Sequence, residues 1–323
     1  MRVAAVDCGT NSLRLLVADV DPVAGRLVDV RRETRIVRLG EGVDARGEIA
    51  PAALQRALAV TAGYARRCAE AGVERVRFVA TSAARDARNA ATFTAGVRAV
   101  LGVEPEVLTG AEEARLSFTG AVRGLPAGAG TGAYLVVDVG GGSTEVVLGR
   151  CDAAGPAGPG EPVVVAAASV DVGSVRLTER HLPTDPPSAA EIEAARRDVT
   201  AAIDAAAALV DLGRAGTLVG VAGTVTTVTA HALRLPRYDG SRIHGAVLDV
   251  GAVRSACADL LAMPRAHRAA LPYVPPGRAD VLGGGALLWD LVVERVAGAA
   301  GVRHVVTSEH DILDGVAWGL AGR

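Results

Sequence analysis

The stretch Leu135–Gly149, LVVDVGGGSTEVVLG, decides the fold that this sequence predicts. An apolar run leads into Asp138, three glycines follow, and Ser-Thr-Glu at 143–145 precedes a second apolar run. This pattern is typical of a β-hairpin with polar groups at its bend. Successive N–H groups in a glycine bend bind anions, and an acid on either side suits a hydrated Mg²⁺ beside a phosphate. Taken alone, the stretch leaves open an ordinary hairpin whose turn is rich in glycine.

The N-terminus repeats the same pattern. A short apolar strand, Val3–Val6, ends in Asp7, and Gly-Thr-Asn-Ser follows at 9–12 before a second, mostly apolar run at 13–18. Two copies so far apart in one chain suggest two similar domains that face each other. Each domain would then offer one phosphate-binding loop to a shared cleft.

The paired motifs DxGTNSxR and DxGGGSTE resemble those of the exopolyphosphatase/guanosine pentaphosphate phosphohydrolase (Ppx/GppA) family. The resemblance covers essentially the whole chain. It implies an α/β protein with the duplicated actin-like (ribonuclease H-like) fold, two domains around a central cleft. We expect an N-terminal domain over 1–124 with the first phosphate loop and the catalytic glutamate, and a C-terminal domain over 125–323 with the second loop. Whether the last helix packs back on the first domain is left open.

Composition narrows the possible chemistry. The 323 residues suit two domains, and with 50% hydrophobic but only 3% aromatic residues, aliphatic side chains must fill the cores. The sequence contains no lysine, which excludes a Walker-type phosphate-loop lysine and a Schiff-base lysine. The net charge is −2, so any attraction for phosphates must come from local arginine clusters.

Cysteine spacing and hydropathy predict a soluble, cytoplasmic protein. The four cysteines, at 8, 68, 151 and 257, show no zinc-ligand spacing and are expected to be reduced. We expect no signal peptide, no membrane association and no nucleic-acid polymer as partner, because no apolar run reaches membrane-spanning length and the chain is not basic. A homodimer is left open.

The order of predicted elements is that of mixed sheets flanked by helices. Gly124–Gly132 is predicted to be the interdomain linker, and Cys151–Pro162 a loop between strands of the second domain. Helices are expected at 51–71, 89–101, from 110, 188–212, 280–297 and 312–320, and strands at 27–38, 76–80, 106–108, 163–167, 218–222 and 302–306. Asn89 is expected to cap the second of these helices, and Ser188 with Glu191 has the pattern of a capping box.

The two loops supply groups that position a phosphoanhydride, which is most of what its hydrolysis needs. Backbone N–H groups and side chains for phosphate binding are expected at Thr10, Asn11, Ser12, Gly140, Gly141, Gly142, Ser143 and Thr144. Asp138 and Glu145 are the expected ligands of Mg²⁺, with Mn²⁺ as an alternative. Asp7 either joins them or only shapes its loop.

Two further site residues are implied mainly by the resemblance. The catalytic glutamate of the family lies in a GxEEA segment and matches Glu113, whereas the sequence alone favours a helix N-terminal glutamate. The family's phosphate-binding arginine matches Arg85. Arg14 is expected to turn away from the cleft, and His244 is expected to be structural.

The resemblance implies Mg²⁺-dependent release of terminal orthophosphate from inorganic polyphosphate. Longer members of the family carry a C-terminal helical domain that this sequence lacks, so we expect less surface for a long polymer and a preference for short chains. The first alternative is hydrolysis of guanosine pentaphosphate (pppGpp). A kinase of the same superfamily that uses ATP, with a third small-residue loop at 223–227, and a regulatory module without catalysis are further alternatives. Arginines of one predicted strand favour the polyanion, although such a run is more often a solvated strand edge: Arg31, Arg32, Arg35 and Arg38.

Overall fold

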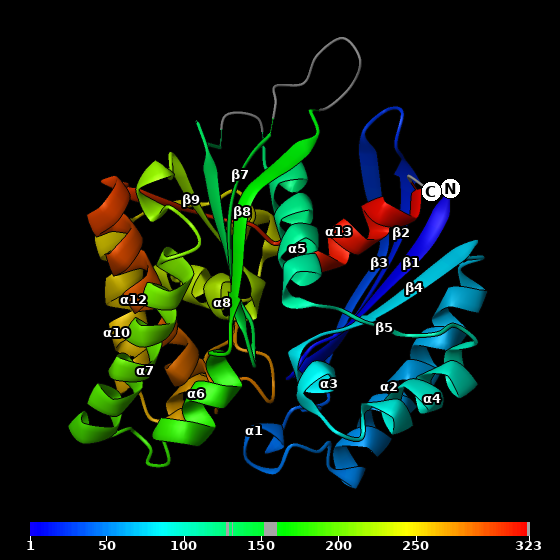
Figure 1. Cartoon of the computed structure of the whole chain (residues 1–323), viewed down its shortest axis with the longest axis horizontal. Helices are drawn as coiled ribbons and strands as arrows, with labels where there is room; N and C mark the ends of the chain where they lie inside the picture. The colour runs from blue at the N-terminus through cyan, green and yellow to red at the C-terminus, as the bar shows by residue number, and fades with distance from the viewer. Residues whose placement is uncertain (127–128, 131, 152–159, 322–323) are drawn as a thin grey trace. The chain divides into compact units, whose positions relative to one another are not determined.

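The computed structural model describes residues 1–126, 129–130, 132–151 and 160–321 (Figure 1). Contacts divide the chain into two compact units, and the division falls within one helix, α5 (Gly110–Gly124). Of the described residues, the first unit contains Met1–Gly120, 160–161 and those from Ile312 on, and the second contains those of Ala121–Cys151 and Pro162–Asp311. The predicted linker and the predicted loop at 151–162 lie partly outside the described residues, at 127, 128, 131 and 152–159.

The first unit is built on a five-stranded sheet in the order β3-β2-β1-β4-β5. β1, β2 and β3 form an antiparallel meander, and β4 and β5 run parallel to β1. The strand bounds are β1 Arg2–Cys8, β2 Ser12–Asp21, β3 Arg26–Ile36, β4 Arg75–Ala80 and β5 Glu106–Val107.

The second unit repeats this topology in a six-stranded sheet, β10-β11-β9-β6-β7-β8. β6, β7 and β8 form the meander, β9 and β11 run parallel to β6, and β10 adds an antiparallel edge. The bounds are β6 Tyr134–Val139, β7 Thr144–Cys151, β8 Pro162–Val170, β9 Thr217–Val221, β10 Val247–Asp249 and β11 His304–Thr307. The same strand order and directions in both units confirm the predicted duplicated α/β fold.

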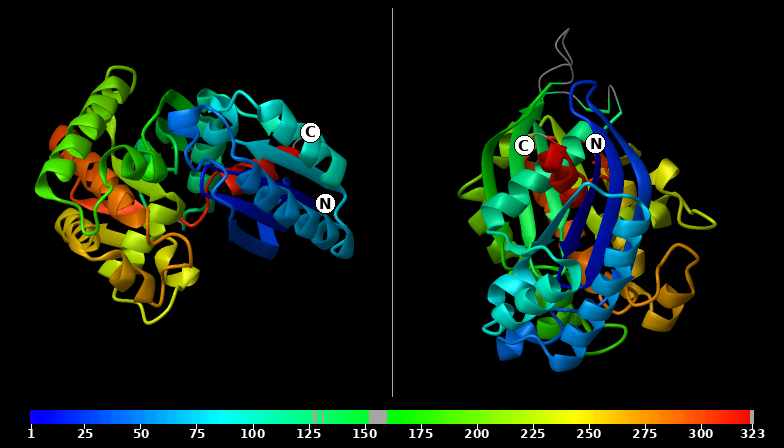
Figure 2. Two further views of the ribbon diagram at one scale, coloured as in Figure 1. Left: turned by 90° about the horizontal axis from the view of Figure 1, so that it is seen from below. Right: turned by 90° about the vertical axis from the view of Figure 1, so that its right-hand side faces the viewer.

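Helices cover both faces of the first sheet. The residues of one face, including Val6 and Leu15, pack with Tyr64 and Phe93 from α2 and α4. The other face, including Val3 and Leu16, packs against α13, and Figure 2 shows this red helix beside the dark blue β1. The helices are α1 Val43–Arg46, α2 Pro51–Glu70, α3 Ser82–Asp86, α4 Ala90–Leu101 and α13 Ile312–Ala321.

Local signals explain most of these helix ends. Pro51 occupies the first turn of α2, where its missing N–H costs nothing, and Gly72 follows the helix with a φ of 65° that favours glycine. Asn89 precedes α4 as predicted, but its side chain makes no cap. It instead bonds the backbone N–H and carbonyl of Ile49, at 2.9 and 3.0 Å, and so joins two loops.

The second unit has one large core beneath its sheet. Alternate residues of β6, namely Leu135, Val137 and Val139, pack with Trp289 of α12 and with neighbouring helices. Ser188 and Glu191 form the predicted capping box of α7. The helices are α6 Ser174–His181, α7 Ala189–Ala207, α8 Ala222–Ala232, α9 Gly240–Ile243, α10 Val250–Ala262, α11 Arg265–Ala270 and α12 Leu282–Ala300. Among the described residues, no helix combines the length and apolar character needed to cross a membrane.

Candidate active site

The first loop, Gly9–Ser12, turns its carbonyl groups toward its own unit. The N–H of Gly9 donates to the carbonyl of Ser12 at 2.9 Å, and the Asn11 carbonyl accepts from the N–H groups of residues 37 and 38 at 3.0 and 2.9 Å. The N–H groups of Thr10 and Asn11 bond no acceptor within the described part of the chain. The bend therefore presents donors outward, as an anion-binding nest does.

The second loop, Gly140–Ser143, is closed by the same bond. The N–H of Gly140 donates to the carbonyl of Ser143 at 3.1 Å, and the carbonyls of Gly140 and Gly141 accept from residues 174–176. The approach is close, because a Cβ at Gly173 would lie 2.5 Å from the carbonyl carbon of Gly141. Over the described ranges, the N–H groups of Gly141 and Gly142 also lack protein acceptors. Two loops of different units thus offer the same donor arrangement.

The threonines that follow the acids support the loops. Thr10 Oγ1 lies 2.8 Å from Ser82 Oγ at the start of α3, and both side chains are buried. Thr144 Oγ1 donates to the carbonyl of Val172 at 2.7 Å. Ser143 is also buried, whereas Asn11 and Ser12 are partly exposed. The structure therefore gives Thr10 and Thr144 a part in holding the loops.

Asp138 and Glu145 lie opposite each other in the β6–β7 hairpin. Directly opposite residues of antiparallel strands share one face of the sheet, so the two carboxylates are neighbours. Both are buried, with 7% and 1% of their surface exposed. Glu145 Oε1 accepts a hydrogen bond of 2.7 Å from Ser169 Oγ of β8.

Asp7 occupies the position of Asp138 in the first unit, but its neighbour differs. Arg14 lies opposite Asp7 in the β1–β2 hairpin and donates to Asp7 Oδ2 from Nε and Nη2, at 3.0 and 2.7 Å. The pair is largely buried, since the Asp7 side chain is 4% exposed. Arg14 therefore neutralises Asp7 within its own unit.

Glu113 and Arg85 form an ion pair in the first unit. Arg85 Nη1 lies 3.0 Å from Glu113 Oε2 and donates to the carbonyl of Leu108 at 2.9 Å. Glu113 is buried, whereas Arg85 is partly exposed. Within the described residues, Nε and Nη2 of Arg85 make no hydrogen bond, so this edge of the guanidinium is available to an anion.

The sequence alone favours a helix-cap role for Glu113, but the cap at the start of α5 is made by the preceding residue, Glu112. Glu112 Oε2 accepts from the N–H and hydroxyl of Thr109, at 2.9 and 2.8 Å, as in a capping box. Hydrogen bonds from Thr109 lower the pKa of Glu112. Glu113 therefore has no part in this cap, and its burial beside Arg85 requires another explanation.

The acid pair of the second unit suits Mg²⁺. The described residues contain no group of three or more His, Cys, Asp or Glu side chains placed to hold a metal. Mg²⁺, however, keeps several waters and commonly takes only one or two carboxylates together with substrate phosphate oxygens. Asp138 and Glu145, adjacent and buried, meet that requirement.

Sequence reasoning missed Ser82, Ser169 and the separate roles of the two adjacent glutamates. Thr109 three residues before Glu112 is the sequence signal for the cap. Ser82 reaches Thr10 because β4 pairs with β1, and Ser169 reaches Glu145 because β8 pairs with β7. Neither serine therefore has a local sequence signal. His244 is structural as predicted: Nε2 lies 2.7 Å from the carbonyl of Gly124, and Nδ1 accepts from the N–H of Glu309.

Two other features of the second unit are separate from these residues. At the third small-residue loop, 223–227, Arg278 Nη1 donates to the carbonyl of Gly223 at 3.1 Å, and a Cβ at Gly223 would lie 2.3 Å from Arg278 Nη2.

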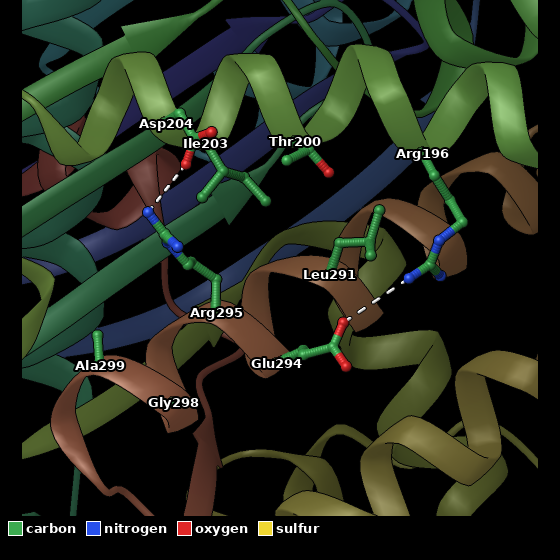
Figure 3. Close-up of a pocket in the computed structure, with 9 residues that line it drawn as sticks. All are labelled: Arg196, Thr200, Ile203, Asp204, Leu291, Glu294, Arg295, Gly298 and Ala299. Carbon is green, nitrogen blue, oxygen red and sulfur yellow. Dashed lines mark hydrogen bonds and ion pairs between the residues drawn. The ribbon is translucent and has the colours of Figure 1, made fainter.

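A surface cavity of about 510 Å³ lies between α7 and α12 (Figure 3). Its arginines pair across it, Arg295 with Asp204 and Arg196 with Glu294, and it contains none of the predicted site residues.

Comparison with known proteins gives one consistent result. Residues 16–317 match the Ppx/GppA phosphatase family. The chain is 48% identical over 328 residues to exopolyphosphatase 2 of Mycobacterium tuberculosis, covering 99% of both chains. The crystal structure of an exopolyphosphatase-like protein superposes with a TM-score of 0.92 and 43% identity, over 99% of this chain and 97% of that one. A guanosine-5'-triphosphate,3'-diphosphate pyrophosphatase of Photobacterium profundum is 36% identical over 147 residues, 46% of this chain and 29% of that protein.

Proposed function

This chain belongs to the Ppx/GppA phosphatase family, and we propose that it is an exopolyphosphatase that releases terminal orthophosphate from inorganic polyphosphate. The observation that carries the proposal is the end-to-end similarity to a relative named exopolyphosphatase 2. Two relatives named guanosine-5'-triphosphate,3'-diphosphate pyrophosphatase match over 46% and 64% of this chain, and over 29% and 37% of their own lengths. The sequence supports a cytoplasmic enzyme, since its cysteines are free thiols.

The reaction needs a water molecule activated beside the terminal phosphorus. We assign this role to Glu113, whose carboxylate accepts a proton as the water oxygen forms its bond to phosphorus. The bond between that phosphorus and the bridging oxygen breaks, and the shortened chain leaves with the bonding electron pair. Glu113 has the required burial, and the helix cap that would otherwise occupy it is made by Glu112.

Binding of the phosphates falls to the two loops and Arg85. The N–H groups of Thr10, Asn11, Gly141 and Gly142 can bond phosphate oxygens without moving, since the loop carbonyls are already fixed to the protein. Preorganised donors of this kind stabilise the charge that develops during phosphoryl transfer. Arg85 adds a guanidinium edge that matches two phosphate oxygens.

We assign Asp138 and Glu145 to a divalent cation, Mg²⁺ in the first instance and Mn²⁺ as the alternative. When bound, this ion neutralises phosphate charge and polarises the bridging region of the substrate. The role of the two side chains is to hold that charge at the second loop. Asp7, which already pairs with Arg14, shapes the first loop in this proposal.

The choice of polyphosphate over pppGpp rests partly on arginines of the first unit. Arg32 is not available, because it pairs with the buried Asp314 of α13 at 2.6 Å. Three other arginines, Arg31, Arg35 and Arg67, surround the single carboxylate of Glu33, which leaves an excess of positive charge. Positive charge of this kind attracts a repeating polyanion more strongly than a nucleotide.

The direct test is orthophosphate release from polyphosphate, pppGpp and ATP in parallel, with Mg²⁺ and with the cation chelated. The proposal predicts release from polyphosphate that requires the cation, and much slower release from ATP. ATP turnover that needs an added small-molecule acceptor would favour the kinase. The absence of turnover on all three substrates would favour a regulatory module.

A further inference from the structure

Another surface cavity of the second unit, of about 500 Å³, lies between the end of α8 and the helix α10. Its lining includes four polar side chains that the proposed function does not use: His231, Ser255, Asp259 and Tyr273. Leu235 and three alanines supply the apolar part of the wall. All the lining residues belong to the second unit, and none of them is assigned above to phosphate or to Mg²⁺.

Tyr273 holds the imidazole of His231 at one of its two nitrogens. The Tyr273 hydroxyl lies 2.6 Å from His231 Nδ1, and Tyr273 is buried. In the tautomer that carries its proton on Nδ1, the hydroxyl oxygen accepts this proton and Nε2 keeps a lone pair. Histidines that bind metal ions usually have such a partner on the second nitrogen, which fixes both the tautomer and the orientation of the ring. The contact with Tyr273 therefore prepares Nε2 as a ligand.

Asp259 lies near His231 at a separation close to that of two ligands of one metal ion. Nε2 of His231 is 3.8 Å from Asp259 Oδ2, which is too long for a hydrogen bond. Bonds from Zn²⁺ to nitrogen and oxygen ligands are about 2.0–2.2 Å, so two ligands of one tetrahedral ion are about 3.4 Å apart. The Asp259 side chain is 66% exposed and that of His231 only 17%, so a small rotation of the carboxylate can close the difference.

A second histidine–aspartate pair of the same unit has a different geometry. His181 Nε2 lies 2.9 Å from Asp198 Oδ2, a hydrogen-bond distance, and Arg180 Nη1 lies 3.2 Å from the same oxygen. Because a direct contact and a neighbouring cation already satisfy this carboxylate, an ion has no place between the two side chains. The second unit thus contains one closed pair, His181 with Asp198, and one open pair, His231 with Asp259.

We propose that His231 and Asp259 bind a divalent transition-metal ion such as Zn²⁺, and that Tyr273 is the positioning residue of the imidazole. Imidazole nitrogen suits Zn²⁺, Ni²⁺ and Cu²⁺, whereas Mg²⁺ prefers oxygen ligands, so this site differs in kind from the acid pair of the second loop. The described residues place no third His, Cys, Asp or Glu here, so water molecules in the cavity complete the coordination. With two protein ligands the ion is exchangeable, unlike the ion of a structural zinc site.

Arg234 also lines the cavity, and its charge opposes the binding of a cation. Its side chain is exposed, so water and salt screen this repulsion. Removal of the charge in Arg234→Gln should therefore tighten Zn²⁺ binding, with the larger effect at low salt. Tighter binding in a variant that adds no charged ligand would distinguish an ion in this cavity from one bound elsewhere on the chain.

The test is isothermal titration calorimetry of Zn²⁺ into the full-length protein with Mg²⁺ in excess. The wild type should bind one Zn²⁺ more per chain than His231→Gln or Asp259→Asn, a difference that cancels any Zn²⁺ bound by cysteines or by the acid pair. Tyr273→Phe keeps both ligands and the ring but removes the hydroxyl, so Zn²⁺ affinity should fall by about tenfold. His181→Gln, the same change in the closed pair, is the matched control and should bind as the wild type does.

Equal Zn²⁺ binding by the wild type, His231→Gln and Asp259→Asn would overturn the inference. Loss of the same ion in His181→Gln would also overturn it, because the loss would then not depend on the open pair. Asp259 is largely exposed, so Asp259→Asn decides the question even if replacement of His231 prevents folding. Wild-type affinity in Tyr273→Phe would refute the positioning role. These outcomes do not depend on orthophosphate release, because none of these residues takes part in the proposed reaction.

Discussion

Arg85 Nη1 lies 3.0 Å from Glu113 Oε2, and the same nitrogen donates to the carbonyl of Leu108. The guanidinium thus joins α3 to the first turn of α5. This nitrogen, Nη1, holds the carboxylate, while Nε and Nη2 make no hydrogen bond to the part of the chain that the structure describes. One arginine can therefore position the proposed base and still bind a phosphate.

Replacement of Glu113 by Gln should lower kcat by about 10²–10⁴-fold with little change in KM, because the amide cannot accept a proton. The neighbouring Glu112→Gln is the matched control. Gln keeps a side-chain oxygen that can accept from Thr109, so both stability and kcat should stay near the wild-type values. Steady-state kinetics on polyphosphate and urea unfolding of both variants provide the comparison. Near-normal turnover in Glu113→Gln would remove Glu113 from the mechanism.

Asp138→Asn and Glu145→Gln should each raise the Mg²⁺ concentration that gives half-maximal activity, since hard cations prefer charged oxygen ligands. The same variants should lose the rise in melting temperature that Mg²⁺ gives the substrate-free wild type. Asp204→Asn removes a solvent-exposed acid of the same unit, paired with Arg295, and serves as control. If both site variants titrate as this control does, these acids only maintain the hairpin.

The cluster around Glu33 should set affinity for long polyphosphate. Burial alone would raise the pKa of Glu33, but hydrogen bonding to Arg31 and the charges of Arg67, Arg31 and Arg35 outweigh it and lower the pKa. Arg31→Gln/Arg35→Gln should raise KM on long chains several-fold at low salt, an effect that added salt should reduce. Glu33→Gln should instead lower KM on long chains, because it removes the carboxylate that the arginines share.

A double variant of equal charge, Arg88→Gln/Arg98→Gln, controls for net charge. Both arginines lie on the first unit, and each pairs with one exposed glutamate. Its KM should stay closer to the wild-type value than that of Arg31→Gln/Arg35→Gln. Equal changes in the two double variants would mean that net charge, rather than this cluster, governs affinity.

Asp314→Asn should destabilise the first unit by about 2 kcal/mol, because it removes the buried carboxylate partner of Arg32, which keeps Asp29 as its second partner. α13 approaches its neighbours closely: a Cβ at Gly315 would lie 2.0 Å from the carbonyl oxygen of Leu116. The fluorescence of Trp318, which lies in α13, reports its release during urea unfolding. A loss of less than about 0.5 kcal/mol, the usual range for an exposed pair, would contradict the buried-pair interpretation.

The sequence was sufficient to predict the fold where local patterns recur. The run from Leu135 to Gly149 and its copy at the N-terminus predicted both hairpins, because alternating apolar residues and a glycine bend specify a hairpin locally. Ser188 and Glu191 predicted the start of α7 for the same reason.

The remaining features depend on tertiary pairing. The predicted arginine strand divides between two faces: Arg32 reaches Asp314 of α13, whereas Arg31 and Arg35 reach Glu33 on the α2 side. Side-chain alternation predicts that neighbours diverge, but not what covers each face. Ser169 is 24 residues from Glu145, and only the register of β7 with β8 brings them together. Asn89 shows how a longer-range partner can displace a local cap.

The central claim is tested most directly by catalytic efficiency, kcat/KM, on short polyphosphate, long polyphosphate and pppGpp at low and moderate salt. The account predicts that polyphosphate is the better substrate, that short chains are preferred, and that added salt lowers kcat/KM on polyphosphate through KM. A tenfold or greater preference for pppGpp, with little effect of salt, would contradict it and assign the enzyme to guanosine pentaphosphate.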